Sequence, residues 1–210
     1  MRKLLIVALL ATACENPAKD KPKAEVGEAK PTSEATAPAA AGAKALPLGP
    51  ETSSIEWTGA KVTGSHPGGF KSWRGTLHYV PGAPEKSKLE IEIDADSLWT
   101  NDDKLLGHLR SPDFFDVAKF PKATFVSTEI RPGGDKGATH TIVGNLTLHG
   151  VTKSITFPVT FKEEGSQLTA DSEFAINRKD FGIVYPGAPD DLIRDEVVIK
   201  LKVKAEAPKA

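Results

Sequence analysis

Apolar and polar residues alternate with period two over most of the chain after residue 51, and this pattern predicts β-strands. In one run Leu89, Ile91 and Ile93 share a face, and the acidic residues between them take the other. Eight such runs can be counted, near residues 53–62, 70–80, 88–96, 123–131, 140–149, 154–163, 167–177 and 195–206. Most of the connections are short and rich in glycine and proline. Neighbouring strands are therefore expected to pair antiparallel in an up-and-down order.

One apolar face per strand over eight strands fits either a closed β-barrel or a two-sheet sandwich. Eight is also the number of strands at which a barrel can hold one small ligand. The alternation does not distinguish a ligand tunnel from a packed core, and a packed core is the ordinary case. One strand is ambiguous, because the adjacent apolar residues Phe125 and Val126 point to opposite faces.

A segment of helical character interrupts the strands. Its apolar residues at helical spacing are Leu105, Leu106 and Leu109. Thr100, with Asp103 three residues later, is typical of a helix start, and Ser111 followed by proline predicts a second helical turn. That turn would carry Phe114 and Phe115. We expect a short helical lid, about residues 101–116, over the apolar opening of a barrel.

The N-terminus has the features of an export signal. Residues 1–13 combine a basic start, an apolar run too short to span a bilayer and small residues before Cys14, which indicates a signal peptide of the lipoprotein type. Cys14 is the only cysteine, so an intramolecular disulfide is excluded and lipidation of Cys14 is expected. Ordinary signal peptidase cleavage also suits the sequence and would leave this cysteine without lipid. The expected location is the periplasm or cell envelope, with the protein anchored to a membrane through Cys14.

The segment 14–50 is dominated by alanine, proline, lysine and glutamate and has no aromatic residue. Such a composition cannot bury enough apolar surface to fold, so it predicts a disordered tether. Residues 51–210 are then expected to form one folded domain. That domain has 20 basic and 23 acidic side chains, with the two signs interspersed. This balance excludes nucleic-acid binding and electrostatic docking on anionic lipid.

No arrangement of residues typical of an enzyme or a metal site is found. The five histidines are far apart, no HExxH motif is present, and no second cysteine exists. The adjacent carboxylates Asp102 and Asp103 suit a helix N-terminus, and Asp190 with Asp191 suits a solvated turn. We therefore predict no catalytic residues, no metal, no cofactor and no enzymatic activity.

Three blocks of sequence carry a family resemblance. They are HLRSPDFFDVAKFP (residues 108–121), LTLHGVTK (residues 146–153) and INRKDFG (residues 176–182). In this order and spacing they resemble the YceI-like family of polyisoprenoid-binding, lipocalin-like proteins, over roughly residues 51–206. The resemblance implies an eight-stranded antiparallel up-and-down lipocalin-like barrel with a long isoprenoid lipid in its apolar interior.

The one-sided strands and the resemblance together give candidate ligand contacts. The apolar residues expected to line the ligand are Ile91, Ile93, Leu146, Leu148, Phe157, Phe161, Leu105, Leu109, Phe114 and Phe115. A polar mouth that holds a head group is expected from His108, Arg110, Asn177, Arg178 and Asp180. Two of these residues have a structural alternative: Arg178 as part of a charged pair that closes the barrel end, and Arg110 as a partner of Asp113 or Asp116.

The function expected from this combination is an envelope lipoprotein that binds a polyisoprenoid for transport, storage or sequestration. The alternative is a structural or interaction barrel with a packed core that binds no lipid. The sequence leaves the oligomeric state, monomer or homodimer, undetermined.

Overall fold

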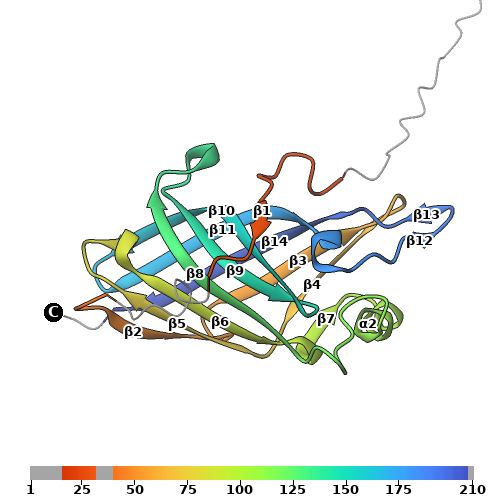
Figure 1. Cartoon of the computed structure of the whole chain (residues 1–210), viewed down its shortest axis with the longest axis horizontal. Helices are drawn as coiled ribbons and strands as arrows, with labels where there is room; N and C mark the ends of the chain where they lie inside the picture. Colours follow the sequence, from red (N-terminus) through yellow and green to blue (C-terminus); the bar gives the residue numbers. More distant parts are fainter. Residues whose placement is uncertain (1–15, 32–39, 208–210) are drawn as a thin grey trace, which may run out of the picture.

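The computed structural model describes residues 16–31 and 40–207, which form a curled antiparallel sheet with a helix at one end (Figure 1). The predicted signal peptide and Cys14 lie outside the described residues. The strands are β1 (Glu25–Glu28), β2 (Lys44–Leu48), β3 (Ser54–Ala60), β4 (Ser65–Phe70), β5 (Trp73–Tyr79), β6 (Lys88–Asp94), β7 (Leu98–Thr100), β8 (Lys122–Pro132), β9 (His140–Leu148), β10 (Val151–Glu164), β11 (Gln167–Asn177), β12 (Gly187–Ala188), β13 (Asp191–Leu192) and β14 (Glu196–Glu206). The helices are α2 (Asp103–Arg110) and the short 3-10 segments η1 (Pro84–Lys86), η2 (Ala95–Ser97), η3 (Asp135–Gly137) and η4 (Arg178–Phe181). No helix within these two ranges is both long and apolar enough to cross a bilayer.

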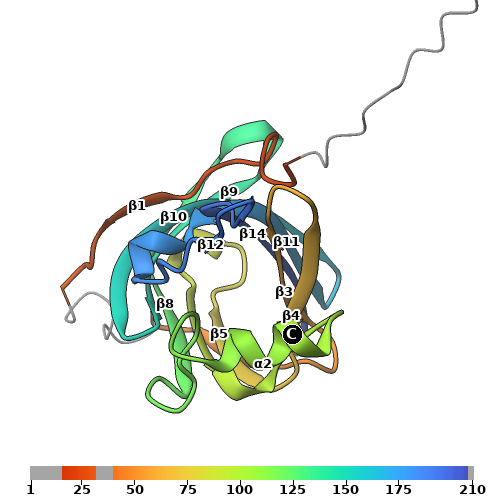
Figure 2. The ribbon, with the colours of Figure 1, turned by 90° about the vertical axis from the view of Figure 1, so that its right-hand side faces the viewer.

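The paired strands form a ring. β4 continues into β5 through two residues, and β6 continues into β7 through η2, so each pair acts as one bent strand. The pairing then runs from β3 to β4–β5, β6–β7, β8, β9, β10, β11 and β14, and β14 pairs with β3 again. Figure 2 shows this ring end-on. The antiparallel barrel predicted from the alternation is confirmed, and its main strands match the eight predicted runs.

A β-bulge resolves the ambiguous strand. In β8 the pairing with β9 shifts between Ser127 and Glu129. Before the bulge Phe125 is buried in the interior, whereas after it the even-numbered Ile130 packs against the same cluster. The buried hydroxyl of Ser127 accepts the backbone N–H of Leu89 at 2.8 Å. The extra residue therefore changes which face of β8 points inward, and a strict period-two pattern cannot describe it.

The lid is present with different local structure from the one predicted. Asp102, and not Thr100, is the N-cap of α2, and its carboxylate accepts the backbone N–H of Leu105 at 3.0 Å. This hydrogen bond lowers the pKa of the Asp102 carboxyl. The residues after α2 form hydrogen-bonded turns instead of a second helix. Leu109 and Phe114 nevertheless pack into one buried cluster at this end of the barrel.

Part of the segment predicted as a tether is ordered, so its predicted boundary at residue 50 is wrong. β3 pairs with β4, the first half of the bent strand, and β2 pairs with β5, the second half. Leu46 and Leu48 of β2 are buried. These two leucines alternate with polar or exposed positions, the same pattern as the later strands. Low aromatic content therefore does not exclude a strand when a neighbouring strand edge is free to pair.

β1 fills a gap in the barrel wall. β10 and β11 pair only from Thr160 and Asp171 to their connecting turn, and the two strands diverge toward the lid end. In this gap β1 pairs antiparallel with β10, and a parallel bridge joins Lys23 to Ala175 of β11. The backbone of Ala175 accepts from Ala24 and donates to Pro22, both at 2.8 Å. The segment before residue 32 is thus partly a strand of the wall.

We predict that Val26→Asp destabilises the barrel. Val26 packs against the buried cluster that includes Ile155 and Phe174, and a carboxylate there loses water without gaining a partner. The free energy of unfolding in urea is expected to fall by about 1–3 kcal/mol. Glu25→Gln, at an exposed neighbouring position of β1, is the control and should change it by less than about 0.5 kcal/mol. Equal stability of the two variants would mean that β1 contributes nothing to the fold.

Candidate ligand-binding site

The barrel encloses a cavity of about 220 Å³ beneath the lid, here called the lid-end cavity. Its wall takes side chains from almost every main strand, together with Leu109, Phe114 and Phe115 of the lid segment. The wall is apolar except for two charged residues, Arg178 and Arg194. Apolar residues that face inward from a closed barrel would normally interdigitate and leave few voids larger than a water molecule. A cavity of this size and composition is suited to an apolar ligand.

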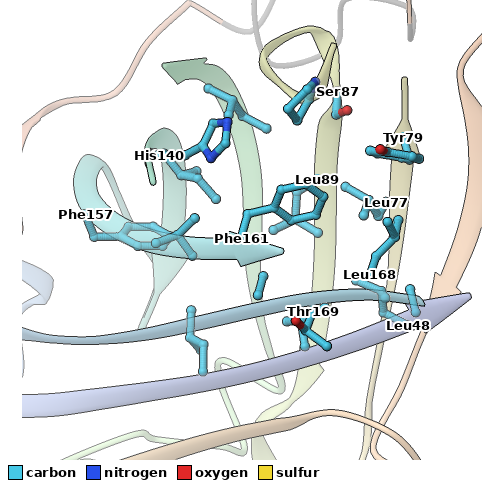
Figure 3. Close-up of a pocket in the computed structure, with 18 residues that line it drawn as sticks. Leu48, Leu77, Tyr79, Ser87, Leu89, His140, Phe157, Phe161, Leu168 and Thr169 are labelled. Carbon is cyan, nitrogen blue, oxygen red and sulfur yellow. The ribbon is translucent and has the colours of Figure 1, made fainter. Parts of the chain in front are cut away.

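A second cavity of about 80 Å³, the far-end cavity, lies toward the opposite end of the barrel. Figure 3 shows the ring of Phe161 between Phe157 on one side and Leu77 and Tyr79 on the other. The two cavities share Leu89, Phe157, Leu201 and Val203 as wall residues. The two cavities are therefore adjacent along the interior of the barrel.

The structure brings together most of the apolar residues predicted to line a ligand. Those on the wall of the lid-end cavity are Ile91, Ile93, Leu146, Leu148, Phe157, Leu109, Phe114 and Phe115. Phe161 lies on the wall of the far-end cavity. Leu105 is the exception: it lines neither cavity and packs within the lid, against the cluster that contains Leu109.

The polar residues predicted on the lid do not reach the cavity. His108 hydrogen-bonds the Asp113 carboxylate at 2.8 Å, and its ring contacts Phe114 and Tyr185 at centroid distances of 4.9 Å. Arg110 pairs with Asp96, with 3.0 Å between Nε and Oδ1. The partner is therefore Asp96, and not Asp113 or Asp116 as the structural alternative from the sequence predicts. The side chains of His108 and Arg110 are half-buried, and neither lines the lid-end cavity.

Arg178 is buried and fully engaged with the protein. Its guanidinium donates to the carbonyl oxygens of Ile183 at 2.7 Å and Arg194 at 3.2 Å, and it lies 3.3 Å from Asp195. Burial lowers the pKa of Arg178, and the Asp195 carboxylate acts in the opposite direction. This is the structural arrangement that the sequence offered as the alternative to head-group binding.

The neighbouring predicted residues also have local contacts. Asn177 accepts the backbone N–H of Lys179 at 2.9 Å and so caps η4. Asp180 is half-buried on η4 and does not line either cavity. No group of three or more histidine, cysteine or acidic residues suitable for a metal ion occurs in the described part of the chain.

Sequence reasoning missed Arg194 and the position of Trp57. Arg194 precedes β14 in an irregular segment, where no periodicity indicates its direction. Trp57 lies across Gly68 of the neighbouring strand, where a Cβ would come within 2.1 Å of the indole. Gly68 of β4 is therefore a local signal that a large ring occupies this part of the wall.

Comparison with known proteins agrees with this architecture. The sequence model of the YceI-like domain matches residues 47–205. The chain belongs to the YceI-like family. A UPF0312 protein of Pseudomonas fluorescens is 41% identical over 126 residues, which cover 57% of this chain and 65% of that protein. The match thus spans less than two thirds of the length of this relative.

Solved structures show the same fold. BcnA of Burkholderia cenocepacia aligns with a TM-score of 0.67 at 25% identity, over 75% of this chain and 99% of that one. A polyisoprenoid-binding domain of Saccharophagus degradans aligns with a TM-score of 0.60 at 17% identity, over 79% of this chain and 99% of that one. The second likeness concerns the fold alone. The resemblance expected from the three sequence blocks is confirmed at the level of the family.

We predict a loss of stability in alkaline solution that depends on Tyr79. Tyr79 is 1% exposed, and its hydroxyl donates to the Glu163 carboxylate. Burial of the hydroxyl is the largest cause, and the hydrogen bond to Glu163 the second, of a Tyr79 pKa that is raised to about 12. The unfolded chain releases this proton near pH 10, whereas the folded state keeps it to a higher pH. The stabilisation is complete below about pH 10 and is lost as the pH rises toward about 12. Tyr79→Phe should make the decline in melting temperature over this range shallower. An unchanged decline would exclude Tyr79 as its source.

Proposed function

We propose that this protein binds a long-chain polyisoprenoid lipid inside the barrel, for transport, storage or sequestration. The observation that carries the proposal is the apolar cavity beneath the lid, with its continuation toward the far end. Membership of the YceI-like family supports it, as does the likeness to a polyisoprenoid-binding domain. The proposed role is binding, with no catalytic step.

The alternative, a structural barrel with a packed core, leaves the cavity unexplained. Cavities in protein cores cost about 24 cal/mol for each Å³, so a void of about 220 Å³ would forgo about 5 kcal/mol of packing. A ligand that fills the void recovers this contact. Each buried five-carbon unit contributes roughly 3–4 kcal/mol before the costs of binding are subtracted. An apolar chain is therefore the occupant that the wall favours.

Native mass spectrometry of the protein, purified from the cells that naturally produce it, tests this proposal. The expected result is an added mass that corresponds to a polyisoprenoid and disappears after extraction with organic solvent. A protein that carries no lipid, and takes up no polyprenol when one is supplied, would exclude the binding function and leave the structural alternative.

We further propose that the protein is exported and held at a membrane by lipid on Cys14. The basic start, the apolar run and the single cysteine at its end support this location. Cys14→Ser is expected to move the protein from the membrane fraction to the soluble fraction after export. A wild-type protein that is already in the soluble fraction would contradict the anchor, without bearing on the cavity.

A further inference from the structure

Three large hydrophobic side chains are exposed within residues 16–31 and 40–207, and all three lie at one end of the molecule. They are Val62, Val184 and Leu192, which are 53%, 62% and 49% exposed. Val62 is in the turn between β3 and β4, Val184 follows η4, and Leu192 is in β13. Single exposed apolar residues are common on protein surfaces, whereas a group of them marks a contact surface. We call these three residues the apolar tip.

Backbone hydrogen bonds join the segments that carry the apolar tip. The N–H of Val62 donates to the carbonyl oxygen of Leu192 at 3.1 Å. The N–H of Ile193 donates to the carbonyl oxygen of Pro186 at 2.9 Å, which holds the segment of Val184 beside that of Leu192. Figure 1 shows the turn between β3 and β4 and the β12–β13 hairpin together at the right-hand end of the molecule. The tip is therefore one surface built from two loops.

The apolar tip stands beside the lid-end cavity. Val184 follows Ile183, Leu192 precedes Ile193, and both isoleucines line that cavity. Neighbouring side chains of an extended segment point in opposite directions, so the isoleucines face inward where Val184 and Leu192 face outward. The exposed apolar residues thus lie at the end of the barrel that holds the larger cavity.

The charged residues next to the tip are paired with each other. Lys61 and Asp191, the chain neighbours of Val62 and Leu192, form an ion pair with 2.6 Å between Nζ and Oδ2. Their charges cancel, so this pair offers no positive field to anionic head groups. A partner of the tip is therefore held by apolar contact, which depends little on salt.

The ordered N-terminal segment places the proposed anchor near the same end. Ala18 is 0% exposed and packs on Ala175 and Val198, close to where β11 ends and β14 begins at the lid end. Asn16, the first described residue, follows Cys14 by two residues, and two residues span at most about 7 Å. Lipid on Cys14, as proposed above, would therefore keep the lid end of the barrel close to the bilayer.

We propose that the apolar tip docks on the surface of a lipid bilayer, so that the lid end of the barrel faces the membrane. The choice of partner rests on the proposed function, because a polyisoprenoid is held in membranes and not in water. Valine and leucine side chains that are half-exposed gain further burial at the boundary between head groups and acyl chains. A second copy of the chain is the other partner that an apolar surface admits, and the test distinguishes the two.

Flotation with vesicles of phosphatidylcholine tests the docking surface. The full chain carrying Cys14→Ser is used, because it lacks the proposed anchor. The vesicles are in excess, since a few side chains bind far more weakly than an anchor and the complex would not survive cell fractionation. We expect this chain to float equally well at low and high salt. Val184→Asp and Leu192→Asp should each lower the partition coefficient about fivefold, because about half of each side chain remains to be buried.

Two further variants control the experiment. Pro81→Asp adds the same charge at an exposed position of the opposite end, where its neighbours Tyr79 and Pro84 line the far-end cavity, and it should leave the partition coefficient unchanged. Val184→Trp should raise the coefficient severalfold, because tryptophan favours the membrane interface, and it keeps the test decisive if an aspartate variant does not fold.

The outcomes separate the docking surface from the binding function. No flotation of the Cys14→Ser chain, or equal flotation of Val184→Asp, would overturn the docking surface. Flotation only with vesicles that contain phosphatidylglycerol, and only at low salt, would assign the contact to charge and overturn it as well. A dimer in solution that Val184→Asp dissociates, without flotation, would assign the tip to a second copy. Flotation that depends on the tip, by a protein that takes up no polyprenol, would support the docking surface and exclude the proposed function.

Discussion

Replacing Ile91 or Leu148 with tryptophan empties the barrel of lipid while the protein stays folded. Both side chains are half-buried because they face the lid-end cavity and are not enclosed by other side chains. The added bulk of an indole then occupies space that the ligand uses. The expected result is loss of the co-purifying lipid in native mass spectra, with the midpoint of urea unfolding of the delipidated protein nearly unchanged.

A packed barrel would respond in the opposite way. Overpacking a filled core costs about 1–3 kcal/mol, so both variants would be destabilised and no lipid would be present in the wild type to lose. Thr147→Trp is the matched control, since its hydroxyl hydrogen-bonds Thr152 at an exposed position beside Leu148. It should retain the lipid. Loss of lipid from the control as well would attribute the effect to strand distortion and not to the cavity.

Replacing Arg178 with methionine destabilises the barrel strongly. The methionine keeps most of the length of the side chain but leaves several carbonyl oxygens without their donor, and Asp195 keeps only Lys179 as an ion-pair partner among the described residues. Removing one partner of a buried ion pair typically costs 3–5 kcal/mol, and because Asp195 is 42% exposed we expect about 2–4 kcal/mol here. Urea unfolding at neutral pH measures the change.

A conservative variant tests the donor geometry of Arg178. Arg178→Lys keeps the charge but not the planar set of donors, so it should recover only part of the lost stability. A loss of less than about 1 kcal/mol in Arg178→Met would show that water replaces the guanidinium, and that the residue does not close the barrel end. The structural role of Arg178 would then have to be abandoned.

The sequence block that contains Asn177, Arg178 and Asp180 shows how far a motif by itself predicts side-chain contacts. The sequence indicates that a polar cluster lies at one end of the barrel, and the structure agrees. Whether a guanidinium points to protein carbonyls or to a ligand depends on how residues 183–195, which follow the motif along the chain, fold back against it. In the structure Arg178 donates to protein carbonyl oxygens, whereas the Nε of Arg194, which no motif marks, has no acceptor among the described residues.

Alternation by itself determined the main strands, their antiparallel order and which residues face inward, because side chains of a strand must point alternately to the two faces. The strand residues on the wall of the lid-end cavity that the sequence predicts, among them Ile91, Ile93, Leu146 and Leu148, follow from this rule. Local signals were also sufficient for the helix at 103–110, although not for its cap or for the turns after it.

Only the tertiary structure decided the features that depend on contacts between distant segments. The gap between β10 and β11 exists because these strands diverge, and β1 fills it with a segment whose composition resembles a tether. The cavity exists because side chains from opposite walls fail to meet, a property of barrel radius and not of any single strand. Strand pairing, closure of the barrel and the cavity are relations between residues far apart in the chain, and no local pattern in the sequence encodes them.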